Sequence, residues 1–260
     1  MSAERALPLL YTQLAEWFHL LTRPADYATE AEIYRRAIDS ALPVVQGAAR
    51  RSMLELGSGG GNTASHLKDD FALELSDLSP AMIAVSRRLN PRLVHHQGDM
   101  RTLRLGKEFD VVFLHDAVMY MTTEEDLRAT IETARVHTRP GGAVLIVPDY
   151  TQETFRQGVH AGGHDGVDVT PPQPGRALRY LEWIHDPDPT DTECIVDFAY
   201  LLLDRDGEVR AYSDRHVFGV FPRATWLRLL EEGGFAVRPV PFDHPEVDGV
   251  TEMFLGVRRQ

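Results

Sequence analysis

The chain has 260 residues, of which 43% are hydrophobic and 25% charged, and these proportions are those of a folded globular protein rather than a disordered or fibrous one. This length is enough for one α/β domain with an insertion or a modest lid. The formal net charge of -12 argues against nucleic acid as a partner, because proteins bind phosphate backbones through clustered Lys and Arg.

Cysteine content and hydropathy indicate the cellular compartment in which the protein is expected. The single cysteine, Cys194, rules out an intrachain disulfide, so an oxidising compartment is not required. The N-terminal segment lacks a basic stretch followed by an unbroken apolar run. No apolar run approaches the roughly 20 residues of a membrane span. We therefore expect a cytoplasmic protein with no membrane partner.

The first part of the chain, residues 1–45, is predicted to be helical. Apolar residues recur at helical spacing over residues 10–21, and a Thr-Arg-Pro sequence at 22–24 interrupts the pattern. A second helical pattern runs from about Tyr27 to Leu42 and ends at Pro43.

Strands and helices alternate over residues 46–150. The predicted strands are 52–56, 73–75, 94–97, 110–114 and 142–147, and the predicted helices are 62–68, 80–89 and 124–138. Such alternation with short connections predicts a parallel sheet that helices cover on both faces. We expect this segment to be the core of an α/β fold.

The pattern changes over residues 151–221. Residues 158–175 are rich in Gly, Pro, His and Asp and predict an irregular loop. Long strands are predicted at 179–184, 193–203 and 209–221, with Pro and Gly in the turns between them. This spacing is typical of an antiparallel β-meander inserted into the fold.

The last segment, residues 222–260, returns to the pattern of the core. A helix is predicted from Pro222 to Glu232, where a Gly-Gly pair ends it. Two further strands are predicted at 235–240 and 253–257. We expect these elements to complete the core sheet.

A glycine-rich segment, Glu55-Leu-Gly-Ser-Gly-Gly-Gly-Asn62, lies directly after the first predicted strand and before a helix. Glycines remove Cβ atoms, so the backbone can turn tightly and approach a ligand closely. The dinucleotide fingerprint needs Gly or Ala at the place that Asn62 occupies, and no Gly-Lys-Ser/Thr follows as in a P-loop. The segment alone leaves the identity of the cofactor open.

Residues that follow the next two predicted strands narrow the choice of cofactor. Asp77, 20 residues after Gly57, follows the second predicted strand, where a carboxylate can accept hydrogen bonds from both ribose hydroxyls. Leu78 and Met82 are apolar neighbours suited to an adenine face. After the third strand, Asp99 could accept the adenine amino group while the Met100 backbone contacts a ring nitrogen. Each acid alone is typical of a helix cap, but both together behind the glycine segment indicate an adenosine site.

Five motifs together resemble the class I S-adenosylmethionine-dependent methyltransferases. They are Glu55-Leu-Gly-Ser-Gly-Gly-Gly61, Asp77-Leu-Ser-Pro-Ala-Met82, Gly98-Asp-Met100, Phe109-Asp-Val-Val112 and Arg139-Pro-Gly-Gly142. The resemblance covers about residues 50–150 and implies a Rossmann-like fold with S-adenosyl-L-methionine as cofactor. It identifies the cofactor and not the methyl acceptor.

The resemblance also implies which residues contact the cofactor. They are Glu55, Gly57, Ser58, Gly59, Gly61, Asp77, Leu78, Met82, Asp99, Met100 and His115. Glu55 and the glycine backbone would hold the methionine end, Asp77 the ribose, and Asp99 the adenine. His115, just past the fourth strand, would lie near the sulfur, although a His at a strand end is also often a structural residue.

A looser likeness extends outside the core. Tyr11, residues 27–30, residues 152–155 and the late antiparallel strands resemble bacterial N-methyltransferases that act on amino sugars in macrolide and related antibiotic pathways. Glycine N-methyltransferases share parts of the same plan. This likeness implies that residues 1–45 form a helical lid over the cofactor and that residues 151–221 roof the acceptor site.

The chemistry needs few catalytic groups. Methyl transfer is an in-line displacement that depends on holding the nucleophile close to the methyl carbon. An amine acceptor must have a free lone pair, so a His or Tyr could take its proton or orient it. The candidates are Tyr11, His115, Tyr120 and His216, and each also fits a packing or hydrogen-bonded structural role.

The predicted function is N-methylation of an amine on a small polar natural product or sugar. The sequence leaves open O-methylation of a hydroxylated natural product, a cofactor-binding protein without catalysis, and a nicotinamide-dependent oxidoreductase. His160 and His164 lie near Asp165 and Asp168 but match no metal-ligand spacing, so no metal is expected. The expected partner is a small-molecule acceptor, and a homo-oligomer is left open.

Overall fold

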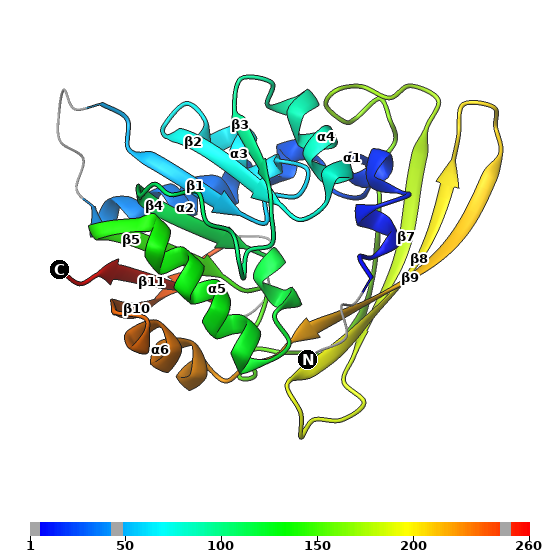
Figure 1. Cartoon of the computed structure of the whole chain (residues 1–260). Coiled ribbons are helices and arrows are strands. Elements are labelled where there is room, and N and C mark those ends of the chain that lie inside the picture. The colour runs from blue at the N-terminus through cyan, green and yellow to red at the C-terminus, as the bar shows by residue number, and fades with distance from the viewer. Residues whose placement is uncertain (1–5, 43–48, 245–250) are drawn as a thin grey trace.

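The computed structural model describes residues 6–42, 49–244 and 251–260, and its larger sheet has seven strands in the order β10-β11-β5-β4-β1-β2-β3 (Figure 1). Its strands are β1 (Ser52–Leu56), β2 (Ala72–Asp77), β3 (Val94–Gln97), β4 (Phe109–His115), β5 (Thr138–Val147), β10 (Phe235–Phe242) and β11 (Thr251–Arg258). Strands β1 to β5 run parallel, while β11 is antiparallel to both of its neighbours. The predicted helix end at Pro43 and the predicted boundary between residues 45 and 46 lie outside the described residues.

Alternate residues of the central strands enter two separate cores. Met53 and Val111 pack beneath α2 (Ala28–Ala41) and α3 (Asn62–Leu67). Their neighbours Leu54 and Val112 pack on the other face beneath α5 (Glu124–His137) and α6 (Arg223–Glu232). The remaining helix, α4 (Pro80–Leu89), packs against β2 and β3. Burial on both faces explains the nearly continuous apolar runs of these strands.

The smaller sheet is antiparallel, in the order β6-β7-β8-β9. Its strands are β6 (Gly158–Gly162), β7 (Ala177–His185), β8 (Glu193–Leu203) and β9 (Val209–Gly219). The even-numbered residues of β7, β8 and β9 form its inner face, and there Leu178, Tyr200 and Leu202 pack against the N-terminal segment. That segment lies between the smaller sheet and the core (Figure 1). The predicted α/β fold with an inserted antiparallel meander is confirmed.

The prediction of a single helix over residues 10–21 is wrong. The segment consists of two short 3-10 helices, η1 (Leu9–Tyr11) and η2 (Ala15–Trp17), followed by α1 (Phe18–Leu21). The Thr12 hydroxyl donates to the Pro8 carbonyl at 3.1 Å, and such a local bond competes with a continuing helix. The apolar residues also divide between two surfaces, since Leu10 faces the smaller sheet and Ala15 packs against α4.

Three other predictions need correction. The loop expected over residues 158–175 contains the edge strand β6, which pairs with β7. Its sequence, Gly-Val-His-Ala-Gly, does not show the pattern of a strand. Strand β5 begins at Thr138 rather than residue 142, directly after the last residue of α5. The 3-10 helix η3 (Pro24–Tyr27) precedes α2, which begins one residue later than predicted.

No helix within the described ranges is long and apolar enough to cross a membrane. The cytoplasmic location stays a prediction.

Candidate active site

The glycine-rich segment forms a tight turn after β1. Gly57 has φ +77° and Gly59 has φ +52°, both in the left-handed region that residues with a side chain rarely adopt. A Cβ on Gly57 would lie 2.4 Å from the Cβ of Ala117 and 2.8 Å from the Cε of Met100. The backbone is therefore packed so closely that only glycine fits at Gly57.

Three buried polar atoms of the glycine-rich segment lack a hydrogen-bond partner among the described residues. They are Oε2 of Glu55, Oγ of Ser58 and Oδ1 of Asn62. Burial raises the pKa of Glu55 to about 8, against the opposing charge of His115. A buried carboxyl without a partner costs free energy unless a ligand supplies one. A cationic group such as the α-ammonium of a methionine moiety fits this position.

Asp77, at the end of β2, lies against the same turn. Its two carboxylate oxygens accept hydrogen bonds at 2.8 Å from the backbone N–H of Gly59 and of Ser79. Burial raises the pKa of Asp77, while these N–H donors lower it. Each oxygen keeps a lone pair that can accept a further hydrogen bond, as the ribose role requires.

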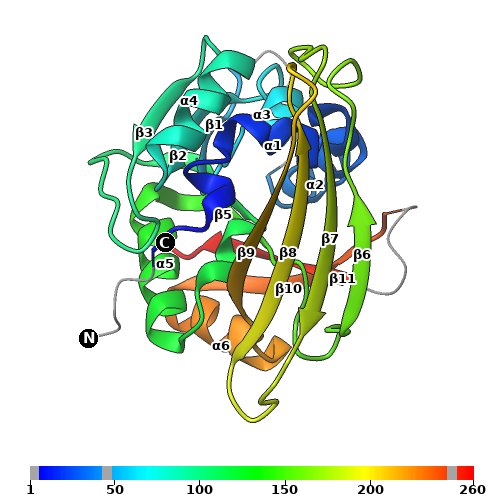
Figure 2. The same cartoon turned by 90° about the vertical axis from the view of Figure 1, so that its right-hand side faces the viewer.

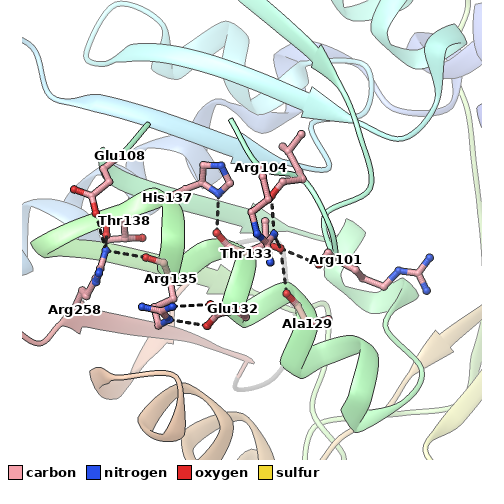
Figure 3. A network of polar contacts seen from close by, with 11 residues as sticks. Arg101, Arg104, Glu108, Ala129, Glu132, Thr133, Arg135, His137, Thr138 and Arg258 are labelled. Carbon is pink, nitrogen blue, oxygen red and sulfur yellow. Dashed lines mark hydrogen bonds and ion pairs between the residues drawn. The ribbon is translucent and has the colours of Figure 1, made fainter. Parts of the chain in front are cut away.

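Two sets of polar contacts hold the loop after β3 in place. Arg101 donates to the Asp99 carboxylate at 2.6 Å and to Asp126 of α5 at 2.9 Å. Burial alone would raise the pKa of Asp99, but the bond with Arg101 lowers it. In addition, the Thr133 hydroxyl donates to the Arg101 carbonyl at 3.0 Å and accepts from Arg104 at 2.7 Å (Figure 3). Asp99 is therefore an oriented carboxylate that already shares its charge with Arg101.

The apolar residues predicted for the adenine face differ in exposure. The side chain of Leu78 is 44% exposed and free to cover a ligand. Met82 is buried against Tyr11 and Phe18, with its Cε 3.9 Å from where a Cβ on Gly59 would stand. Met82 and Met100 thus contact the glycine turn at different points.

A cavity of about 180 Å³ opens at the carboxyl ends of β4 and β5. Four acidic residues line it, together with His115: Glu30, Asp116, Asp149 and Glu252. Arg223 pairs with Glu252 at 2.6 Å, which leaves the other three, here called the carboxylate cluster. A larger cavity of about 390 Å³, around Phe155 and Arg156, contains none of the predicted site residues.

His115 and Asp116 hold the centre of this cavity. His115 Nε2 lies 2.7 Å from Oδ1 of Asp116, 2.9 Å from the Tyr34 hydroxyl and 3.7 Å from Oε2 of Glu30. Asp116 has φ +46°, and no other non-glycine residue in the described parts of the chain has a positive φ. Such backbone strain is concentrated at functional sites, where the surrounding structure holds it in place.

The carboxylate cluster carries unequal charges. Burial raises the pKa of Asp149 well above its usual value, and the charge of Asp116 raises it further. Burial acts on Asp116 too, but the charge of His115 outweighs it and lowers the pKa of Asp116. The pKa of His115 is raised because Asp116 and Glu30 outweigh its burial. These shifts favour an ion pair between Asp116 and His115 and favour the protonated form of Asp149, and a nearby cation would oppose that protonation.

Three of the four candidate catalytic residues are joined by hydrogen bonds. The Tyr120 hydroxyl lies 3.0 Å from the Tyr11 hydroxyl and 2.7 Å from Nδ1 of His216. Nε2 of His216 lies 3.2 Å from Oδ2 of Asp214. The fourth candidate, His115, belongs to the carboxylate cavity instead.

Acidic residues of the site affect the ionisation of Tyr11. Burial raises the pKa of Tyr11, and the charges of Asp116, Asp77 and Asp149 add to this effect. Its hydroxyl therefore lies within electrostatic reach of both the ribose-side acid and the carboxylate cluster.

The sequence analysis missed Glu30, Asp116, Asp149 and Asp214. Asp116 and Asp149 follow the carboxyl ends of β4 and β5, where open α/β sheets place their ligands, so strand ends alone could have indicated them. Glu30 and Asp214 gave no such signal. Among the described residues, no group of three or more His, Cys, Asp or Glu is arranged to hold a metal ion.

Comparison with known proteins identifies the class. A family model described as a methyltransferase domain matches residues 53–142. The chain is 30% identical to the dTDP-4-amino-2,3,4,6-tetradeoxy-D-glucose N,N-dimethyltransferase of Saccharopolyspora spinosa, over 91% of this chain and 88% of that protein. It is 29% identical to the dTDP-3-amino-3,4,6-trideoxy-alpha-D-glucopyranose N,N-dimethyltransferase of Streptomyces venezuelae, over 84% of this chain and 86% of that protein.

The chain also shares its fold with a solved structure of a related protein. The crystal structure of Streptomyces venezuelae DesVI matches 95% of this chain and 98% of its own, with a TM-score of 0.77 and 26% identity. The chain belongs to the class I S-adenosylmethionine-dependent methyltransferases, with S-adenosyl-L-methionine as methyl donor. Within that class it is related to the bacterial dTDP-amino-sugar N,N-dimethyltransferases. The predicted family and cofactor are confirmed, and a nicotinamide-dependent oxidoreductase is excluded.

Proposed function

We propose that this enzyme methylates the amine of a small polar acceptor, an amino sugar carried on a nucleotide. The observation that carries the proposal is the carboxylate cluster of Glu30, Asp116 and Asp149 around His115. An ammonium group would pair with an ionised carboxylate of this cluster and favour loss of the Asp149 proton, whereas a hydroxyl acceptor would do neither. The names of the related enzymes, which act on dTDP-linked amino sugars, support the same substrate class.

The methyl donor would lie across the turn after β1 and supply the activated methyl group. Glu55 would bind its ammonium group, Asp77 the ribose hydroxyls, and Asp99 with the Met100 backbone the adenine. These roles follow from the orphaned Glu55 oxygen, the glycine turn and the free lone pairs of Asp77. The N-terminal segment would act as a lid and the smaller sheet as a roof over the acceptor.

Transfer of a labelled methyl group tests the proposed acceptor. The enzyme is incubated with isotopically labelled S-adenosylmethionine and either a dTDP-linked amino sugar or the same sugar with a hydroxyl in place of the amine. We expect label only on the amine. Equal methylation of the hydroxyl sugar would instead establish O-methylation and contradict the proposal.

The affinity for S-adenosylhomocysteine should depend on pH through Glu55. Burial raises the pKa of Glu55 to about 8 in the free enzyme, so below pH 8 the carboxyl must lose a proton before it can pair with the ligand ammonium. Proton linkage then predicts about a tenfold loss of affinity for each pH unit below this pKa. Isothermal titration calorimetry between pH 6 and 8 measures it.

The matched variant for this prediction is Glu55→Gln, whose amide does not titrate. It should bind more weakly than wild type at pH 8 and show a flat profile between pH 6 and 8. A flat profile in the wild-type enzyme would contradict the assigned role of Glu55.

We further propose that a second copy of the chain covers the outer face of the smaller sheet. This face, formed by β6 and the odd-numbered residues of β7, β8 and β9, exposes six large apolar side chains: Val159, Leu181, Trp183, Leu201, Leu203 and Val209. Nothing in the described chain lies in front of it (Figure 2). Three paired strands of about ten residues and the shorter β6 together span about 600 Å². This area is close to the roughly 800 Å² per partner of a stable interface. On this face Arg215 pairs with Asp197, and Arg179 pairs with Asp165, so these charges are balanced and two copies can meet there despite their net charge.

Sedimentation tests this dimer. The wild-type enzyme should sediment at twice the mass of one chain, and Leu181→Lys should reduce it to a single chain because a buried unpaired charge opposes association. Val94→Lys is the control, since Val94 is 51% exposed on β3, outside the proposed interface. A wild-type enzyme that sediments as one chain, or equal effects of both substitutions, would refute the interface.

A further inference from the structure

We infer that His137, the last residue of α5, is a positioning residue for the cofactor, because it holds in place the loop that carries Asp99 and Met100. This loop, residues 98–108, joins β3 to β4 and is here called the adenine loop. The inference rests on the proposed binding of adenine by Asp99 and Met100. It adds a condition to that proposal: the adenine loop is held in the binding position only while His137 is neutral.

Both ring nitrogens of His137 are bonded to backbone groups. Nε2 lies 2.9 Å from the backbone nitrogen of Leu105, which belongs to the adenine loop. Nδ1 lies 2.8 Å from the carbonyl oxygen of Thr133, one turn back along α5 (Figure 3). A backbone N–H can only donate and a carbonyl can only accept, so Nε2 must accept and Nδ1 must carry the hydrogen. These two bonds select one neutral tautomer, and a second ring proton would break the bond to the loop.

The surroundings of His137 favour its neutral form. Its side chain is 1% exposed, so water cannot replace either bond. Burial lowers the pKa of His137, although its bond to a carbonyl partly opposes this effect. Arg104 and Lys107 from the adenine loop and His96 from β3 act in the same direction as burial. Glu74 of β2 pairs with both Lys107 and His96.

His137 is one of three residues by which α5 holds the adenine loop. Asp126, Thr133 and His137 are seven and four residues apart, which places them along one face of the helix. The first two bind the side chain and the carbonyl of Arg101, whereas His137 binds Leu105, four residues farther along the loop. The loop is therefore held at both ends of the short segment that follows Asp99 and Met100.

A shift of the adenine loop would change the cofactor site. Met100, Leu103 and Leu105 pack together on the core beneath α5, so the three positions move as one unit. The Cε of Met100 also lies 2.8 Å from where a Cβ on Gly57 would stand, which joins the loop to the glycine turn. Loss of the His137 bond should therefore weaken binding of the adenine. It should leave kcat at saturating cofactor unchanged, because the loop contacts the adenine and not the transferred methyl group.

His137→Gln and His137→Leu test this role with 5′-methylthioadenosine as the ligand. The probe carries adenine and ribose but no ammonium group, so Glu55 does not contribute to its pH dependence. The Gln amide oxygen can accept from the Leu105 N–H and does not titrate, whereas Leu leaves that buried donor without a partner. At pH 8, calorimetry should show His137→Gln within about threefold of wild type and His137→Leu about tenfold weaker.

The pH profile separates positioning from packing. Wild-type affinity for the probe should fall as pH decreases through the pKa of His137, because the protonated ring cannot accept from Leu105. His137→Gln should lack this part of the fall. Protonation of Asp77 would weaken both proteins alike, so the ratio of their two dissociation constants isolates His137. Nitrogen-15 NMR of the histidine side chains, without ligand, should show the Nδ1–H tautomer of His137 at pH 8 and give its pKa independently.

The control is His160→Gln, an exposed histidine on β6 of the smaller sheet, which should bind the probe as wild type does at every pH. An Nε2–H tautomer of His137, wild-type affinity in His137→Leu, or a wild-type to Gln ratio that does not change with pH would overturn the inference and leave the proposed function standing. If His137→Leu does not fold, the tautomer and the Gln ratio decide. An enzyme that shows the expected tautomer and ratio but methylates no amine would overturn the proposed function and not this inference.

Discussion

Asp77→Ala is expected to lower the affinity for S-adenosylhomocysteine by about 100-fold to 10,000-fold. The carboxylate ends β2 beside the glycine turn, with a free lone pair on each oxygen for the ribose hydroxyls. Two hydrogen bonds to a charged acceptor contribute about 1.5–3 kcal/mol each, and about 1.4 kcal/mol corresponds to a factor of ten in affinity. Isothermal titration calorimetry with S-adenosylhomocysteine measures the loss directly.

The same carboxylate also accepts the Gly59 and Ser79 N–H groups, so a control must separate binding from folding. Asp77→Asn keeps one acceptor oxygen and should fall between wild type and the Ala variant. Asp69→Ala, at an exposed turn, should bind as wild type does. Unchanged affinity in a folded Asp77→Ala protein would refute the assignment of Asp77 to the ribose.

Asp149→Asn should lower kcat/KM for an amine acceptor about 100-fold without lowering the melting temperature. Burial and the charge of Asp116 raise the pKa of Asp149 and so favour its protonated form in the free enzyme, which Asn closely matches. Binding an ammonium requires the ionised form, which Asn cannot supply. Losing one buried charge partner costs several kcal/mol, enough for the stated factor.

The sign of the stability effect provides a second check on the same variant. A carboxyl whose pKa is raised in the folded protein destabilises the fold as pH rises from the unfolded-state value through the folded one. Asn removes this loss, so the variant should melt at or above the wild-type temperature at pH 8. Asp70→Asn, at an exposed position, should leave both kcat/KM and melting unchanged. Full activity of Asp149→Asn would show that the cluster does not bind the acceptor.

The core of the fold was predictable because burial dictates its sequence. Strands β1, β4 and β5 are covered on both faces, so their apolar runs stand out between glycine turns and amphipathic helices. The N-terminal segment was not predictable from periodicity, since Leu10 and Ala15 pack on different surfaces and Thr12 bonds to its own backbone. Strand β6 was missed because an edge strand bounded by glycines lacks a pattern of its own.

The candidate site was predictable only where neighbouring residues define it. The glycine turn and Asp77 stand in one short stretch, so their spacing carries the signal. The carboxylate cluster is assembled from α2 and from the loops after β4 and β5, residues that only the fold brings together. Asp214 contacts the Leu10 backbone across the fold, and the sequence around Asp214 gives no sign of that contact.

A crystal structure of the enzyme with S-adenosylhomocysteine and a dTDP-linked amino sugar tests the central claim most directly. It should show the homocysteine ammonium bonded to Glu55, the ribose hydroxyls on Asp77, and the sugar nitrogen in the cavity with Asp116 and Asp149. An amine bound elsewhere, with that cavity closed by side chains or facing a hydroxyl, would contradict the account.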